Sequence, residues 1–315
     1  MTDDHRLGNH FTSYYNFRSL AKMAAMLEMI PPVYRPPSEA NSFLLQATLG
    51  CSHNKCTYCN MYRHKKFRTV PLEQLRQQTR HAVACDPNIK RVFLCDGDAF
   101  VLSTKKLVAI LEMLNEEIPL LHRVGLYAYA PNIKNKTDED LKLLRSLKLS
   151  IAYIGLESGY DPTLLAIQKG ADANEHIELV KRLQAQGFKT SIMCLLGLTA
   201  KEQRLEASQA TAKVLNLMQP TFASFLTMTP VEGTEIHHQI EKGSFTQASP
   251  KQSLEELHEI VSQLELKQSI FMCNHASNYL PLKGVFPRDK DKILATIQEG
   301  IDDDLLLKPE FLRGL

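Results

Sequence analysis

The chain has 315 residues, of which 44% are hydrophobic, and a formal net charge of +2. This nearly balanced charge gives no indication of a dedicated nucleic-acid or membrane-surface binder. No stretch approaches the roughly 20 apolar residues that a membrane-spanning helix requires. Residues 1–5 are polar and do not resemble a targeting segment. Because free cysteines without a secretory signal are typical of a reducing compartment, we expect the protein in the cytoplasm.

Residues 1–40 precede the first predicted strand. Residues 14–29 fit an amphipathic helix, and proline pairs follow it at 31–32 and 36–37. The segment is too short to form a hydrophobic core of its own. We therefore predict an N-terminal helical extension over residues 1–40 that packs on the main domain.

The region from residue 41 to residue 230 alternates short apolar runs with helical patterns. Continuous apolar runs rich in Val, Ile, Leu and Phe are typical of strands buried on both faces. Helices between such strands indicate a parallel sheet. The pattern predicts an α/β fold, either an open partial barrel or a doubly wound sheet. The expected strands are 43–48, 91–95, 124–128, 149–156, 189–196 and 222–228, and the expected helices are 71–84, 104–116, 137–147, 174–186 and 200–218.

Residues 231–315 follow this core. Residues 251–267 and 289–300 have helical patterns, and the segment 274–279 is polar within an otherwise apolar region. We expect residues 231–315 to form a C-terminal extension that completes the mouth of a barrel. The polar segment is expected to close either the mouth or the bottom.

The polar and glycine residues of the core gather where the predicted strands end. In parallel α/β folds, ligands bind at the carboxyl ends of the strands. A cysteine-rich stretch follows the first strand, and glycine or polar residues follow each of the other five. We therefore predict one site built from several strand ends. The stretches concerned are 51–59, 96–98, 127–132, 155–159, 195–198 and 227–230.

The most informative stretch holds Cys51, Cys56 and Cys59 with the spacing Cys-x4-Cys-x2-Cys. Thiolates are soft ligands, and three of them on one loop suit an iron–sulfur cluster. A four-iron cluster held by three thiolates keeps one iron without a protein ligand, and an open position is where a metal site performs chemistry. The alternative is a structural zinc site with His53 or a distant cysteine as fourth ligand, although the sequence contains no second ligand pair. The other four cysteines are isolated, and we expect most of them to be small buried hydrophobes.

The cysteine stretch, together with Gly97-Asp98 and the string Gly-Leu-Glu-Ser-Gly at 155–159, resembles the radical SAM superfamily over about residues 40–230. The resemblance is to the core shared by oxygen-independent coproporphyrinogen oxidases, elongator-type tRNA modifiers and methylthiotransferases. It implies a partial (β/α)6 TIM-like barrel with N- and C-terminal helical extensions. It also implies S-adenosylmethionine and a [4Fe-4S] cluster held by the three cysteines.

The same resemblance implies an enzyme that cleaves S-adenosylmethionine with one electron from the cluster. The resulting 5′-deoxyadenosyl radical would abstract hydrogen from a substrate that the sequence does not identify, and a reductant such as flavodoxin or ferredoxin would supply the electron. The common family spacing is Cys-x3-Cys-x2-Cys, so this chain has one extra residue in the loop. No clear nucleic-acid domain and no acetyltransferase-like domain follow the core, which disfavours a methylthiotransferase and an elongator-type enzyme.

Four residues near the first two strand ends are candidate cofactor contacts. By resemblance, Tyr58 packs near the adenine, and shielding of the cluster is its alternative role. Gly97 would let the backbone approach a ligand closely. The carboxylate of Asp98, or alternatively that of Asp96, would accept a charge-assisted bond from the methionine ammonium. Ordinary turn chemistry is the competing explanation of this Asp-Gly-Asp string.

Later strand ends supply the remaining candidates. Glu157 and Ser158 are positioned to bind ribose hydroxyls or the methionine ammonium, and an N-cap role is the alternative for Ser158. Tyr127, Met193 and Leu196 are predicted to line the cofactor pocket, although apolar strand residues more often belong to the core. The competing function for the whole chain is a non-catalytic zinc or iron–sulfur protein in binding or redox sensing.

Overall fold

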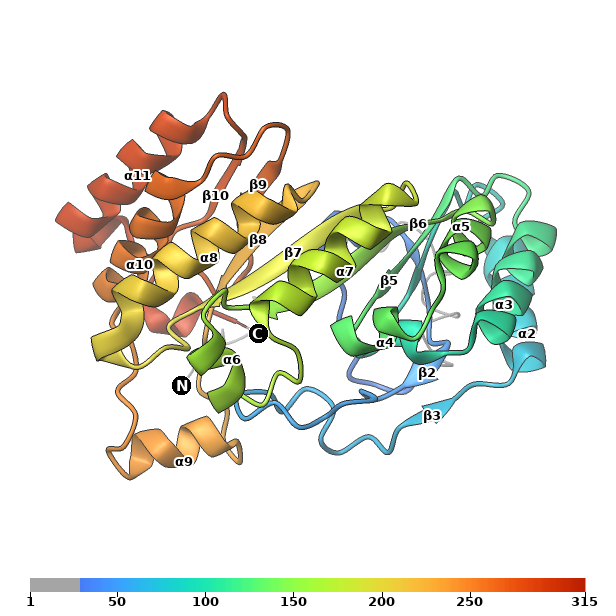
Figure 1. The fold of residues 1–315 in the computed structure, drawn as a ribbon. Coiled ribbons are helices and arrows are strands. Elements are labelled where there is room, and N and C mark those ends of the chain that lie inside the picture. The colour runs from blue at the N-terminus through green and yellow to red at the C-terminus, as the bar shows by residue number, and fades with distance from the viewer. Residues whose placement is uncertain (1–28, 315) are drawn as a thin grey trace, which may run out of the picture.

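The computed structural model describes residues 29–314 (Figure 1), so the predicted helix over 14–29 lies outside the described residues except for its last position. The central element is an eight-stranded sheet whose neighbouring strands follow chain order. The first seven strands are parallel, and the last pairs with its neighbour in the antiparallel sense. The strands are β1 (Phe43–Leu45), β4 (Arg91–Leu94), β5 (Arg123–Tyr127), β6 (Leu149–Glu157), β7 (Lys189–Leu196), β8 (Phe222–Thr227), β9 (Ile270–Cys273) and β10 (Leu282–Val285).

The strand order decides between the two architectures that the sequence allowed. A doubly wound sheet needs a point where the strand order reverses, with helices on both faces. Here the order runs from β1 to β9 without a reversal, and the helices line up along one face (Figure 1). The α/β prediction of an open partial barrel is confirmed, and the doubly wound alternative is excluded.

The helices between the strands begin and end close to the predicted residues. Thr137 forms a capping box with Asp140 at the start of one helix, and Gly187 adopts a positive φ of 80° just after the end of another. None of the helices within residues 29–314 has the length and apolar composition that crossing a bilayer requires. The helices are α2 (Leu72–Cys85), α3 (Thr104–Glu117), α4 (Ala130–Lys134), α5 (Asp138–Ser146), α6 (Asp161–Ala166), α7 (Ala173–Ala185), α8 (Arg204–Met218), α9 (Glu235–Glu241), α10 (Pro250–Gln263) and α11 (Lys290–Asp302).

The two faces of the sheet have different environments. One face packs against the helices and forms the large hydrophobic core. On the opposite face, Phe93 and Tyr153 are buried in a smaller cluster that Met29 and Val33 help to cover. Tyr127 and Met193 also belong to this face and stay partly exposed. The inner face of the partial barrel therefore keeps accessible side chains close to the strand ends.

The C-terminal extension adds two strands that the sequence pattern did not predict. Each has only four residues, too few for a clear periodicity. The polar segment between them is anchored at the carboxyl end of β8: the Asn278 side chain accepts from Thr227 Oγ1 at 3.0 Å, and Ser277 Oγ accepts from Thr227 N at 3.3 Å. This segment therefore lies at the mouth of the barrel, on the same edge as the other strand-end loops.

Candidate cofactor site

The cysteine loop lies between two short strands, β2 (Thr48–Leu49) and β3 (Arg68–Thr69), which pair in the antiparallel sense and fix both of its ends. All seven cysteines of the chain are free. The three in the loop are partly buried, and three of the four isolated cysteines are fully buried, as expected. Cys85 is the exception, because it is exposed at the end of α2.

The base of the cysteine loop is held by a buried ion pair. Lys65 Nζ lies 3.1 Å from Asp96 Oδ2, and the two side chains are 5% and 0% exposed. The same Asp96 oxygen accepts from Gly50 N at 2.8 Å, while Lys65 also donates to the carbonyls of Ile30 and Pro32, both at 2.6 Å. Asp96, the alternative cofactor ligand in the sequence, is thus occupied in fixing the loop that carries the cysteines.

Asp98 joins the cysteine loop to the loop after β5. Its Oδ2 accepts from Ser52 Oγ at 2.6 Å and from Asn132 Nδ2 at 2.5 Å, and its Oδ1 accepts from Tyr129 N at 3.2 Å. Burial raises the pKa of Asp98 to about 6, although these hydrogen bonds oppose the shift. A structural role for Asp98 is therefore visible, while its predicted contact with the methionine ammonium stays a prediction.

The lengthened loop is also fastened through its own histidine. His53 Nε2 lies 2.7 Å from the carbonyl of Gln168, and its Nδ1 lies 3.1 Å from the hydroxyl of Tyr129. The two rings stack with centroids 4.6 Å apart, and Tyr129 also donates to the carbonyl of Lys169 at 3.0 Å. A side chain at Gly170 would meet the Tyr129 hydroxyl at 2.0 Å. Because both His53 nitrogens face protein oxygens, His53 does not suit the role of a fourth zinc ligand.

A second buried ion pair lies beside Cys56. Glu157 Oε1 is 2.8 Å from Lys169 Nζ, and each side chain is 9% exposed. Burial opposes the charge of Lys169, but Glu157 and the Cys56 sulfur outweigh it and raise the lysine pKa. The pKa of Tyr58 is raised well above its ordinary value by burial and by Glu157. Tyr58, Glu157 and Cys56 are therefore neighbours, whereas nothing in the sequence pointed to Lys169.

The other predicted contact residues are divided between the faces of the sheet. Tyr127 and Met193 lie on the inner face, where a ligand could reach them. Leu196 is 2% exposed within the core under the helices, so a cofactor contact from Leu196 would have to come from its backbone. Ser158 is buried, and its hydroxyl accepts from Tyr160 N at 3.2 Å; it does not cap α6, whose N-cap is Tyr160.

The turn after β7 depends on a buried carboxyl group that the sequence did not single out. Glu256 on α10 accepts from Gly197 N at 2.8 Å. Burial raises the pKa of Glu256 from its ordinary value of 4.5 to about 7. The turn that follows the fifth parallel strand is therefore held by a carboxyl group whose charged form is disfavoured by burial.

Glu256 should make the stability of the fold depend on pH. The pKa of Glu256 is higher in the folded than in the unfolded state. The contribution of Glu256 to the free energy of unfolding is therefore complete below pH 4.5 and is lost as the pH rises to about 7. The linkage predicts a loss of about 3 kcal/mol in the free energy of unfolding over this interval. Glu256→Gln should flatten the dependence in urea unfolding of the cluster-free protein, and the exposed neighbour variant Glu255→Gln should keep it. A slope that survives Glu256→Gln would contradict this assignment.

The three thiols of the loop are not arranged as ligands of a single tetrahedral metal ion. In a tetrahedral zinc site with Zn–S bonds of about 2.3 Å, the sulfurs lie roughly 3.8 Å apart. Among the described residues, Cys51, Cys56 and Cys59 do not form a group whose ligand atoms all lie within 4.8 Å. Burial raises the pKa of Cys56 to about 11, so its thiolate needs a metal partner. As they lie in the described residues, the three sulfurs therefore do not have the spacing of ligands to one tetrahedral ion.

The family model of the Radical SAM superfamily matches residues 45–209, which is more than half of the chain. The chain belongs to the radical SAM superfamily. This radical SAM protein is therefore an enzyme, and its cofactors are a [4Fe-4S] cluster and S-adenosylmethionine. The sulfur atoms of Cys51, Cys56 and Cys59 are suitable ligands for this cluster, because three soft thiolates on one partly exposed loop are suited to iron–sulfur ligation.

Solved structures with the same fold are distant in sequence. The methyltransferase TsrM from Kitasatospora setae has 16% identity and a TM-score of 0.53, covering 64% of this chain and 39% of its own. The hydrogenase maturase HydG has 17% sequence identity and a TM-score of 0.52, and the match covers 81% of this chain and 54% of HydG. Coproporphyrinogen III oxidase HemN from Escherichia coli has 15% sequence identity and a TM-score of 0.51, and the match covers 68% of this chain and 50% of HemN. The radical SAM protein thus spans about half or less of these relatives, which share its fold. A comparison with curated proteins gives no match.

The contact between His53 and Tyr129 should affect how firmly the cluster is held. Tyr129→Phe removes hydrogen bonds to His53 and Lys169, each worth roughly 1 kcal/mol. We expect the variant to lose the brown absorbance of its cluster several times faster in air than the parent. Tyr160→Phe is the matched control, because it removes one exposed hydrogen bond to Glu206. Equal rates of loss in all three proteins would show that the contact does not support the loop.

Proposed function

We propose that this radical SAM protein uses its cluster to cleave S-adenosylmethionine reductively, and that the 5′-deoxyadenosyl radical abstracts hydrogen from an organic substrate. The observation that carries the proposal is the placement of Cys51, Cys56 and Cys59 on one loop at the carboxyl edge of the sheet. A cluster bound there would supply the electron, and a protein reductant such as flavodoxin or ferredoxin would replenish it.

The side chains around the cysteine loop have separable roles in this proposal. Tyr58, Tyr127 and Met193 would pack against the adenosyl group, because they are partly exposed beside the loop or on the inner face. Glu157 would bind a ribose hydroxyl or the methionine ammonium through the oxygen that does not contact Lys169. Gly97 and the backbone around Ser158 and Leu196 would shape the remaining wall. Together these groups would orient the cofactor and exclude water.

Replacing one loop cysteine tests the proposal. After anaerobic reconstitution and reduction, the parent should release 5′-deoxyadenosine from S-adenosylmethionine. Cys56→Ala should reduce the release to background, because two thiolates do not hold a four-iron cluster with one open corner. The exposed Cys85→Ala is the matched control and should keep the parent rate. Release by Cys56→Ala at the parent rate would refute the proposal.

The division of the chain and its location are part of the same proposal. Residues 41–230 would form the catalytic core, with residues 1–40 and 231–315 as extensions, and the enzyme would work in the cytoplasm. The spacing of the three sulfurs disfavours the competing zinc protein, so we do not pursue that function. The relatives differ in their reactions and are longer than this chain. Their substrates are therefore not transferred to it.

A further inference from the structure

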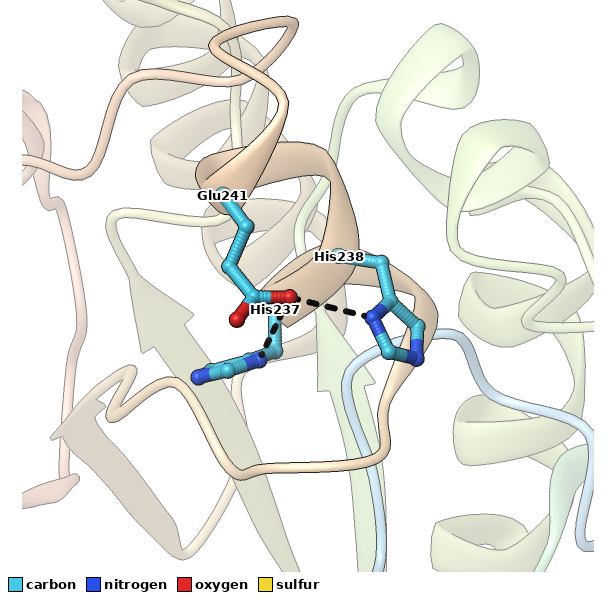
Figure 2. A group of neighbouring side chains, drawn as sticks. All are labelled: His237, His238 and Glu241. Carbon is cyan, nitrogen blue, oxygen red and sulfur yellow. Dashed lines mark hydrogen bonds and ion pairs between the residues drawn. The ribbon is translucent and has the colours of Figure 1, made fainter.

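A second group of side chains with metal-ligating atoms, which includes no cysteine, lies on α9. Figure 2 shows the rings of His237 and His238 on either side of the Glu241 carboxylate. Glu241 Oε2 lies 3.6 Å from His237 Nδ1 and 3.2 Å from His238 Nδ1. One ligand atom from each residue lies within 4.8 Å of the other two. Three donors therefore converge on one point of the surface.

The donor types and their separations suit a divalent transition metal. Imidazole nitrogen and carboxylate oxygen are ligands for zinc, nickel and copper. With bonds of about 2.0–2.2 Å, two ligands of a tetrahedral ion lie roughly 3.3–3.6 Å apart. The two nitrogen–oxygen distances of 3.6 and 3.2 Å lie at or near this range. Only small movements of the Glu241 carboxylate relative to the two rings are therefore needed for both nitrogen–oxygen distances to match those around a bound ion.

One of the two histidine nitrogens has no other partner in the part of the chain that the structure describes. Among residues 29–314, His237 Nδ1 is shielded from solvent and has no hydrogen-bond partner, because the Glu241 oxygen at 3.6 Å is too far away. A buried polar atom without a partner costs about 1–3 kcal/mol. The hydrogen bond of Glu241 goes to His238 instead. An ordinary surface ion pair would leave this nitrogen unsatisfied, whereas a bound cation would use its lone pair.

The position of α9 connects this group to the cysteine loop. Ile236 N, in the first turn of α9, donates to the carbonyl of Thr57 at 3.2 Å. Asn60 Nδ2 donates to the carbonyl of Glu232, just before the helix, also at 3.2 Å. The helix has only seven residues, so it gains little stability from its own hydrogen bonds. An ion that joins its first and last turns would stiffen the segment that supports the loop between Cys56 and Cys59.

We propose that His237, His238 and Glu241 bind one divalent transition-metal ion, and that this ion stabilises α9 against the cysteine loop. The site is separate from the cluster and does not depend on the proposed reaction. Its three protein ligands leave room for water as a fourth ligand, as in other open zinc sites.

Zinc titration of the cluster-loaded protein by calorimetry under anaerobic conditions tests the site, because the loop cysteines are then occupied. We expect one zinc ion per chain. His237→Ala and Glu241→Gln should each weaken binding by at least the roughly 10–100-fold known for outer partners of metal ligands. The exposed His122→Ala is the matched control and should bind like the parent. Far-UV circular dichroism confirms that the variants are folded.

Cobalt as a spectroscopic probe identifies the ligands. We expect weak visible bands of a nitrogen- and oxygen-ligated ion without thiolate charge-transfer absorption. The proposed site would be refuted by any one of three results: thiolate charge-transfer absorption of the bound cobalt, a zinc affinity of His237→Ala equal to that of the parent, or no zinc binding by the parent. Zinc should also slow the loss of the cluster in air in the parent but not in His237→Ala. If the rate of loss is unchanged by zinc in the parent, the coupling to the cysteine loop is refuted.

Discussion

Gly97→Ala is expected to abolish most cluster loading while the fold survives. A Cβ at this position would lie 2.6 Å from Cys51 Cβ, 2.8 Å from its Cα and 3.1 Å from its Sγ. Two of these contacts are to atoms that cannot rotate away, so Cys51 itself must move. Gly97 N also donates to the carbonyl of Gly50 at 3.0 Å, which ties the two segments together. The glycine is therefore required for the position of the first cysteine ligand.

Iron content after anaerobic reconstitution measures this effect. The parent should bind about four iron atoms per chain, and Gly97→Ala should bind less than about a quarter of that amount. Gly314→Ala is the matched control, because an added Cβ there meets only one neighbour, at 3.7 Å. Full iron loading of Gly97→Ala would show that the loop adapts without losing its ligand.

Breaking the buried ion pair beside Cys56 should be the most destabilising single change at the site. Lys169→Met leaves the Glu157 carboxylate buried without its partner, and such a loss costs about 3–5 kcal/mol. Urea unfolding of the cluster-free protein measures the difference. The exposed pair of Lys134 and Glu175 provides the control: Lys134→Met should cost less than about 1 kcal/mol.

The double variant Lys169→Met/Glu157→Gln separates charge from packing. Because it removes both charges, it should recover a large part of the stability lost in Lys169→Met. A double variant as unstable as the sum of the two single variants would mean that the ion pair is not the source of the effect.

The sequence predicted six of the seven parallel strands, because each of the six is a short, continuous apolar run. It also predicted a helix over residues 137–147, and the capping box at Thr137 that begins this helix is a local signal. The placement of the cysteine loop at the end of β1 followed from the general rule for parallel sheets. These features depend on neighbouring residues in the chain, and the structure agrees with them closely.

The supporting contacts could not be predicted, because they join residues far apart in the chain. Lys169 is separated from Glu157 by a short helix, and Tyr129 from His53 by 76 residues. The sequence identified Asp98 as a candidate cofactor contact, which stays a prediction, but it gave no sign of the three hydrogen bonds that Asp98 accepts from Ser52, Tyr129 and Asn132. For Leu196, the alternation along β7 decides which face the side chain occupies, and the pattern alone did not fix that register.

The central claim is that three thiolates hold a cluster whose fourth iron binds S-adenosylmethionine directly. Electron paramagnetic resonance of the reduced cluster, with and without S-adenosylmethionine, tests this most directly. We predict that the signal of the parent changes when S-adenosylmethionine is added, because the cofactor becomes a ligand of the open iron. A signal that stays the same at saturating S-adenosylmethionine would contradict the account, since it would mean that the fourth position is closed.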